Sequence, residues 1–326
     1  MLRKFSRSGV YLQILFILAV SSFYLFSPHP GFASQVFPEN AAPLGRWLSG
    51  ILPDNELVIR ITALILILLN AAGFNIILNH HDLAPRQSLF TALIASVFFL
   101  FTGQAEAMIA PLAALLLLLI SLHSIMKLYA EPYPYTLVLN ASIFVAMASM
   151  IYPLTILFAF FIWMAFFTLR ISSWREWIIS LTGLIVPYVY LAFWFFWNDR
   201  LAVAFNEYHA FFNDFDINWS KPGFLQTVVL FLLGSILIIS MSVFLNDAGE
   251  KIISIRKKMW INAQFLWVAM AVLLLSGKAA LLALPLCYLP MALMAGYMIT
   301  KSRRSWPYDI ALGLFLLLVI LLRLGF

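Results

Sequence analysis

The chain alternates along its whole length between long apolar runs and short polar or basic turns. Several runs approach the roughly 20 residues that a helix needs to cross about 30 Å of hydrocarbon. The runs are continuous and do not alternate residue by residue, which argues against the strands of a membrane barrel. The pattern predicts an all-α, polytopic helical membrane protein with one integral membrane domain over residues 1–326. We expect eleven spans, at 10–27, 57–78, 88–101, 108–126, 135–150, 154–169, 177–197, 224–245, 260–275, 281–299 and 308–322.

The basic turns predict which way the chain is threaded. Arg170 and Arg175 lie in a short turn between two apolar runs, and such turns stay on the cytoplasmic side. Counted outward from this turn, 14 of the 20 Lys and Arg residues fall on the cytoplasmic side. We therefore expect a cytoplasmic N-terminus, an external C-terminus, and two sizeable outer loops near residues 28–55 and 198–223.

Two segments leave the count of spans open. The first apolar run follows three basic residues and precedes Gly31-Phe32-Ala33, which loosely resembles a signal-peptide cleavage site. The run is longer than a usual signal-peptide core, so an uncleaved first helix is favoured. The short hairpin 135–169 is either a pair of spans or a re-entrant segment.

The composition and charge indicate which kinds of molecule the protein contacts. Charged residues make up 10% of the chain and apolar residues 63%, far from the balance of a soluble domain. The net charge of +6 comes from small basic clusters between apolar runs, so it indicates topology and contacts with anionic lipid headgroups, not nucleic acid. Cys287 is the only cysteine, which excludes an intrachain disulfide. Membrane lipids are the expected partners, and the sequence specifies no protein partner.

Ionisable residues inside the bilayer are costly and mark function or pairing. Arg60 follows Glu56 by four residues, a favoured spacing for an ion pair, which we expect near the outer interface. His123 lies one turn before Lys127 and is expected to be an interfacial histidine, with a proton relay as the alternative. His80-His81-Asp82 has metal-ligand residue types, but adjacent histidines on a helix point about 100° apart and would not chelate together without a special turn.

Neutral polar residues and one turn have structural interpretations. Ser173 and Glu176 have the spacing of a capping box at the start of a helix. Four amide side chains in apolar runs are expected to make helix-packing contacts: Asn70, Asn75, Asn140 and Gln264. Walker, Gly-x-Ser-x-Gly, His-Glu-x-x-His and Cys-x-x-Cys motifs are absent, so the sequence predicts no bound cofactor.

The predicted outer loops combine carboxylates with aromatic rings. Rings can stack on sugar faces, while carboxylates accept hydroxyl protons or hold a divalent cation. The alternative is an aromatic belt at the interface with solvated acids. The candidate catalytic residues are Glu39 and Asp54, and the candidate substrate-binding residues are Glu106, Glu207, His209, Asp214, Asp216 and Trp219.

One series of residues carries a family resemblance. Leu169-Arg170, Trp174-Arg175-Glu176-Trp177, Gly183 and Pro187-Tyr188 resemble an uncharacterised family of bacterial inner-membrane proteins, often labelled beta-carotene monooxygenases. The resemblance covers nearly the whole chain and implies a multi-pass protein of the bacterial inner membrane. Carotenoid-cleaving oxygenases hold iron with several histidines. The five histidines here fall on opposite sides of the predicted topology and would not all meet at one iron: His29, His80, His81, His123 and His209.

A second resemblance is architectural. An inside N-terminus, an odd number of spans and a sizeable outer loop after the first span are similar to membrane glycosyltransferases of the GT-C type. That resemblance implies a polyprenyl-phosphate sugar donor, with Glu39 or Asp54 as base or as partner of a divalent cation. The first outer loop is shorter than in that family and lacks its paired acidic motif.

We therefore expect a protein that handles an envelope lipid or lipid-linked sugar at the outer face, with GT-C-like transfer as its chemistry if it is an enzyme. Two alternatives stay open. A secondary transporter would need a polar cavity at mid-membrane. A non-catalytic assembly or scaffold subunit would need a stoichiometric protein partner.

Overall fold

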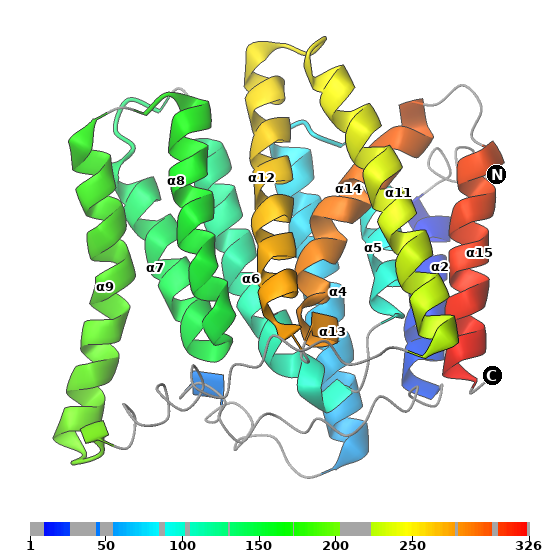
Figure 1. Ribbon diagram of the computed structural model, residues 1–326, viewed down its shortest axis with the longest axis horizontal. Helices are drawn as coiled ribbons and strands as arrows, with labels where there is room; N and C mark the ends of the chain where they lie inside the picture. Colours follow the sequence, from blue (N-terminus) through cyan, green and yellow to red (C-terminus); the bar gives the residue numbers. More distant parts are fainter. Residues whose placement is uncertain are drawn as a thin grey trace.

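The structure is a computed structural model, which describes residues 10–26, 44–45, 55–84, 89–101, 105–129, 131–171, 173–202, 223–277, 280–301 and 306–324. The described residues form a bundle of helices and contain no strand (Figure 1). The helices are α2 (Val10–Phe26), α4 (Glu56–His80), α5 (Phe90–Phe99), α6 (Ala105–Lys127), α7 (Tyr135–Ile151), η1 (Pro153–Leu157), α8 (Phe158–Leu169), α9 (Trp174–Trp197), α11 (Phe224–Ala248), α12 (Ile253–Leu275), α13 (Ala280–Ala283), α14 (Pro285–Lys301) and α15 (Trp306–Arg323).

The helices confirm the predicted class. Within the described ranges, five are long and apolar enough to cross a membrane, namely α4, α6, α9, α11 and α12. Shorter apolar helices accompany them in the bundle, including α2, α5 and α7. The protein is an all-α helical membrane protein. Each of the eleven expected spans overlaps a described helix, but the number that cross the bilayer stays a prediction.

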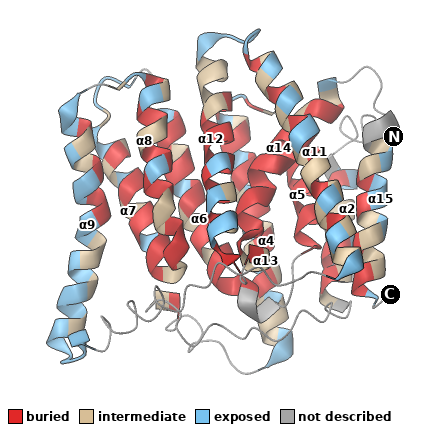
Figure 2. Ribbon diagram, viewed as in Figure 1, coloured by how far each residue is buried: buried red, intermediate tan, exposed pale blue. Residues whose placement is uncertain are grey.

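The centre of the bundle is formed by two short helices. All ten residues of α5 are buried, and so are nearly all residues of α14 (Figure 2). At 1.5 Å per residue α5 is about 15 Å long, half the thickness of the hydrocarbon. It packs against α2, α4 and α14, so its ends meet protein inside the bundle. One continuous apolar core contains residues of each helix named above.

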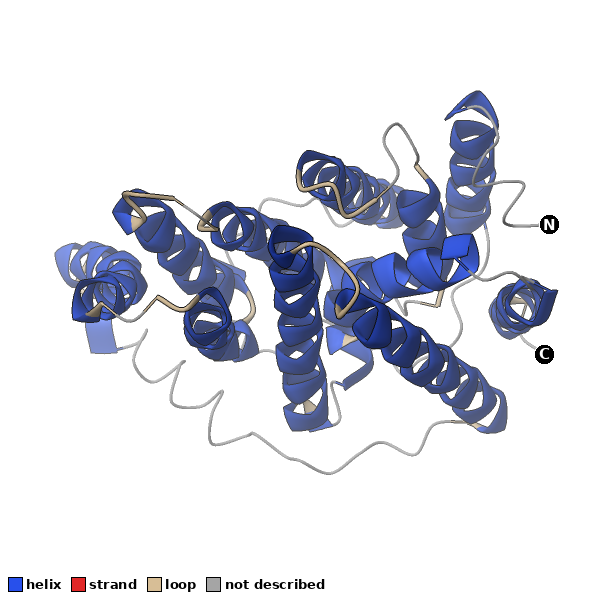
Figure 3. Cartoon of the chain, turned by 90° about the horizontal axis from the view of Figure 1, so that it is seen from above, coloured by secondary structure: helices blue, strands red, loops and turns tan. Residues whose placement is uncertain are grey.

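Helix α9 lies at the edge of the bundle and contacts it along one narrow face (Figures 2 and 3). Its buried residues follow helical spacing: Glu176, Ser180, Gly183 and Leu184. A Cβ added to Gly183 would lie 2.7 Å from Ser142 Cβ of α7, so only glycine allows this approach. Ser142 Oγ donates to Ser180 Oγ at 3.2 Å across the same contact. Small residues and hydroxyl groups thus hold α7 and α9 together, as in many membrane helix pairs.

Prolines mark one predicted break and one that was not predicted. The break between the expected spans 135–150 and 154–169 is confirmed. Tyr152 is extended (φ −129°, ψ 99°) and separates α7 from η1, and Pro153 follows without an N–H to donate. The Thr155 hydroxyl donates to the Tyr152 carbonyl at 2.7 Å and stabilises this turn. The expected span 281–299 is divided into α13 and α14, and Pro285 starts the second piece.

Two local predictions were wrong. Glu106 was expected in an outer turn, but α6 already begins at Ala105, and Ala105, Glu106 and Ala107 are residue types with high helix propensity. Ser173 does occupy the N-cap of α9, yet its side chain makes no capping hydrogen bond. The Glu176 side chain is buried, and its Oε2 has no hydrogen-bond partner within the described part of the chain. The carboxylate is turned into the protein instead of back along the helix.

Candidate functional site

One end of the bundle gathers two arginines from helices distant in sequence. Arg323, the last residue of α15, donates from Nε to the Leu100 carbonyl at 2.7 Å, and its guanidinium lies over the Tyr24 ring at 4.8 Å. Arg60, in the second turn of α4, donates from Nη1 to the Leu25 carbonyl at 3.2 Å. We call these five residues the arginine end. They join the last turns of α2, α5 and α15 to the beginning of α4.

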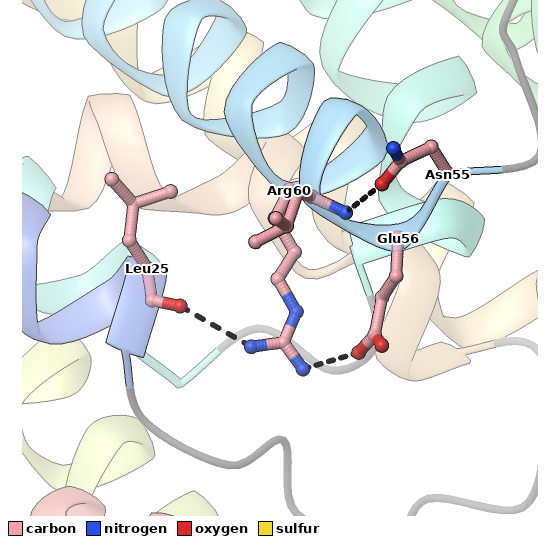
Figure 4. A network of polar contacts seen from close by, with 5 residues as sticks. Leu25, Asn55, Glu56 and Arg60 are labelled. Carbon is pink, nitrogen blue, oxygen red and sulfur yellow. Dashed lines mark hydrogen bonds and ion pairs between the residues drawn. The ribbon is translucent and has the colours of Figure 1, made fainter.

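The beginning of α4 orients Arg60 (Figure 4). Asn55 is the N-cap, and its side chain accepts a hydrogen bond from the Leu57 amide at 3.0 Å. Glu56 in the first turn forms an ion pair with Arg60 Nη2, which confirms the predicted pair. Because Glu56 is exposed and Arg60 is mostly covered, the pair directs the guanidinium along the surface toward the end of α2.

Arg323 is a buried cation, with 1% of its side chain exposed. The last carbonyls of a helix lack partners and carry a partial negative charge, so a guanidinium at the end of α5 is stabilised by the Leu100 carbonyl. The positive charge of Arg60 acts on Arg323, so the two guanidinium groups repel each other. The arginine end is thus electropositive in surroundings of low dielectric.

Polar atoms without partners accompany this charge. The Tyr288 hydroxyl is fully buried, lies within the field of Arg323, and has no hydrogen-bond partner in the described part of the protein. Arg60 Nε is likewise buried without a described partner. Buried polar atoms in proteins are almost always satisfied by protein, water or a ligand. Both atoms are donors, so together with the arginines they suit an anion.

The sequence-predicted site residues fall largely outside the described residues. This holds for Glu39, Asp54, Glu207, His209, Asp214, Asp216 and Trp219. Glu106 lies in the first turn of α6, and its side chain is outside the described part. The described residues flanking these segments share one end of the bundle. The start of α4, the start of α6, the end of α9 and the start of α11 all lie at the lower end in Figure 1, with Arg60.

The opposite end of the bundle brings three histidines together. His81 Nε2 and His123 Nδ1 are 3.2 Å apart, and the His80 ring centroid lies 5.1 Å from that of His81 and 5.3 Å from that of His123. His81 is buried, at 3% exposure. Burial, followed by the Lys258 ammonium, lowers the pKa of His81 to about 3. We call His80, His81, His123 and Lys258 the histidine end.

This convergence was missed by the sequence analysis. Both histidines were expected after the span 57–78, and only a special turn was expected to bring them together. In the structure α4 ends at His80, and His81 lies in the following turn. Asp82, at φ 56°, completes that turn. His123 is 42 positions away in sequence. The sequence offered one signal of this contact: His123 was expected near the cytoplasmic end of its span, the same side as the turn that contains His80 and His81. Within the described ranges, no three His, Cys, Asp or Glu side chains form a group that could hold a metal ion.

Two of the four amide side chains make the expected helix-packing contacts. Asn70 Nδ2 donates to the Leu112 carbonyl at 3.0 Å and joins α4 to α6, and Gln264 Nε2 donates to Thr168 Oγ1 at 2.6 Å and joins α12 to α8. These two predictions are confirmed. Asn140 is exposed, and Asn75 Oδ1 is buried with no described partner.

A small pocket lies between α5 and α14, toward the histidine end. Its lining is mostly apolar and includes Leu83, Phe90, Leu293 and Tyr297. This lining is unlike the polar mid-membrane cavity that a transporter would need.

Comparisons with protein-family models, with curated proteins and with solved structures gave no match for this chain.

Proposed function

We propose that this chain is a multi-pass protein of the bacterial inner membrane that binds a phosphate-bearing envelope lipid, such as a lipid-linked sugar, at the arginine end. The observations that carry the proposal are that Arg60 and Arg323 bind helix-end carbonyls at the same end of the bundle, and that the buried Tyr288 hydroxyl has no hydrogen-bond partner in the described part of the chain. In this proposal the arginine end faces the cell exterior.

The chemistry of arginine favours phosphate over other anions. The planar guanidinium offers paired N–H donors that match two phosphate oxygens, and it stays charged in surroundings of low dielectric. A phosphate bound between Arg60 and Arg323 would relieve their mutual repulsion and accept a hydrogen bond from Tyr288. The position at a helix end suits a lipid whose phosphate lies at the interface and whose prenyl or acyl chain lies in hydrocarbon.

If the protein transfers a sugar, the outer-loop acids supply the chemistry. Glu39 or Asp54 would act as base or hold a divalent cation, and Glu106 and the acids and rings of residues 207–219 would bind the sugar. Support comes from the placement of the flanking elements, since the described residue after Asp54 and the helix turn that contains Glu106 lie at the arginine end.

Lipid binding is tested on the purified full-length protein in detergent. The unfolding midpoint is followed while a short-chain polyprenyl phosphate is titrated, with the uncharged polyprenol as control ligand. We expect the phosphate to stabilise wild type and the polyprenol to do so much less. Arg60→Gln should weaken phosphate binding about tenfold, the size expected for one charge-assisted contact.

Arg200→Gln is the matched control, because Arg200 is exposed near the end of α9 and the substitution removes the same charge. Arg323→Lys keeps the charge at the buried position and removes the planar donors, so it should fold and bind more weakly. Equal binding by wild type, Arg60→Gln and Arg323→Lys would disprove the proposal. Transfer is tested separately by following lipid-linked glycans in cells that carry Glu39→Gln, Asp54→Asn, Glu106→Gln or Asp214→Asn.

A further inference from the structure

The histidine end has more positive than negative charge. The charges of Lys258 and Lys127 both act on His81, and among the described residues the Asp82 carboxylate acts on Lys258. His81 thus lies in the field of two ammonium groups, beside the His80 and His123 rings. A metal cation would be repelled by the lysines, whereas an anion would be attracted by every group except Asp82.

A buried amide extends the cluster into the bundle. Asn262 follows Lys258 by four residues in α12, so the two side chains lie on the same face of that helix. Asn262 is fully buried, and both its Nδ2 and its Oδ1 lack hydrogen-bond partners in the described part of the chain. An amide with neither group satisfied is rare in a protein interior. Asn262 lies one helical turn further into the bundle than Lys258. Its Nδ2 can therefore donate to a ligand that enters from the histidine end.

The histidine pair can adapt to such a ligand. In the contact between His81 Nε2 and His123 Nδ1, one nitrogen donates and the other accepts, according to the tautomer. With an anion present, a second ring N–H can turn toward it, and protonation of the pair becomes favourable. The same atoms can therefore be neutral without ligand and positive with it.

We propose that His81, His123, Lys258 and Asn262 form a second anion site, at the end of the bundle opposite the arginines, which binds a phosphate group. The phosphate comes either from free inorganic phosphate or from the headgroup of an anionic lipid in the adjoining leaflet. This site is independent of the function proposed for the arginine end, since it shares no residue with it.

The test follows the unfolding midpoint of the full-length protein at neutral pH. In detergent, inorganic phosphate is titrated against chloride at equal ionic strength. In nanodiscs, phosphatidylcholine alone is compared with phosphatidylcholine that contains phosphatidic acid. A rise with inorganic phosphate shows that the phosphate group suffices, and a rise with phosphatidic acid alone assigns the site to a lipid headgroup.

Two variants and one matched control make the test specific. Lys258→Gln should weaken the apparent affinity about tenfold, as expected for loss of one charged contact. Lys251→Gln removes the same charge at the same end of the bundle, where Lys251 lies 5.8 Å from the Tyr297 ring centroid, and should respond as wild type does. Asn262→Leu removes an unsatisfied amide, so it should fold at least as stably as wild type without ligand and lose part of the response to phosphate.

Three results would overturn the proposal. The first is no stabilisation of wild type by either phosphate source. The second is an equal response of Lys258→Gln and Lys251→Gln, which would indicate unspecific attraction by basic residues. The third is stabilisation by zinc chloride and not by phosphate, which would assign His81 and His123 to a metal.

Discussion

At the residue scale, the protein uses its few buried ionisable groups at the two ends of the bundle. Arg323 is held by the Leu100 carbonyl and the Tyr24 ring, and His81 by His123. Charged groups deep in hydrocarbon are costly, so each is placed where a helix end or a second polar group compensates it. The burial that makes these groups costly also makes them sensitive to pH and to ligands.

The lowered pKa of His81 predicts a loss of stability in acid. The folded protein keeps His81 neutral down to about pH 3, because His81 is buried and faces Lys258, Lys127, His80 and His123. The unfolded chain takes up a proton below about pH 6.5, so the contribution of His81 is constant above that pH and is lost as the pH falls below it. Between pH 7 and pH 5 we expect a loss on the order of 1 kcal/mol, after allowance for screening by water.

The measurement compares thermal unfolding of wild type and His81→Asn in detergent at pH 7 and pH 5. The variant cannot titrate at this position, so it should lose less stability on acidification than wild type. An identical acid response of both proteins would show that His81 is not held neutral by the fold.

Some contacts of these residues could be predicted from the sequence and others could not. The Glu56 and Arg60 pair was predicted because the two residues share one helix at a spacing of four. The contact of His81 with His123 was missed because it depends on where α4 ends and on a packing partner 42 residues away. The external end expected for Arg323 agrees with its position opposite the histidines, but its burial depends on α5 ending beside α15, which no local pattern encodes.

At the element scale, the contact between α7 and α9 tests how closely helices must approach in this bundle. Gly183→Ala puts a methyl group 2.7 Å from Ser142 Cβ and 3.0 Å from the Leu139 carbonyl. Both neighbours belong to a helix and cannot yield without moving α9. We expect the free energy of unfolding to fall by about 1–3 kcal/mol, the usual size of an overpacking penalty.

Gly234→Ala in α11 is the matched control, since an added Cβ meets nothing within 4 Å there. Alanine restricts the unfolded chain and favours helix, so this variant should be as stable as wild type or slightly more stable. Unfolding midpoints in detergent measure both changes. If Gly183→Ala is no less stable than Gly234→Ala, the close approach of α7 and α9 is not required.

The order of the helices followed from the sequence with few errors, and the exceptions share a cause. Apolar runs of about 20 residues identify helices reliably, so the elements around Arg170 and Pro153 were expected where they are found. The division of the span 281–299 and the early start of α6 were missed. Prolines and the geometry of helix ends set these boundaries, and the hydropathy pattern does not show them.

At the scale of the whole molecule, basic side chains lie at both ends of the bundle. Lys301 pairs with Asp247, and Lys257 donates to the Leu169 carbonyl at 3.3 Å, where α8, α11, α12 and α14 begin or end. These contacts lie at the same end as Lys258 and the histidines, whereas Arg60 and Arg323 lie at the other. The threading with a cytoplasmic histidine end and an external arginine end stays a prediction, made from the distribution of Lys and Arg along the sequence.

The most direct test of this arrangement is the accessibility of single cysteines in intact cells. Cys287 is buried and is replaced by alanine to give a background without cysteine. Asn198→Cys at the end of α9 and Glu250→Cys after α11 then place one exposed thiol at each end of the bundle. A membrane-impermeant maleimide should label Asn198→Cys in intact cells and Glu250→Cys only after permeabilisation. Labelling of both variants in intact cells, or the reverse order, would contradict the threading and the external site built on it.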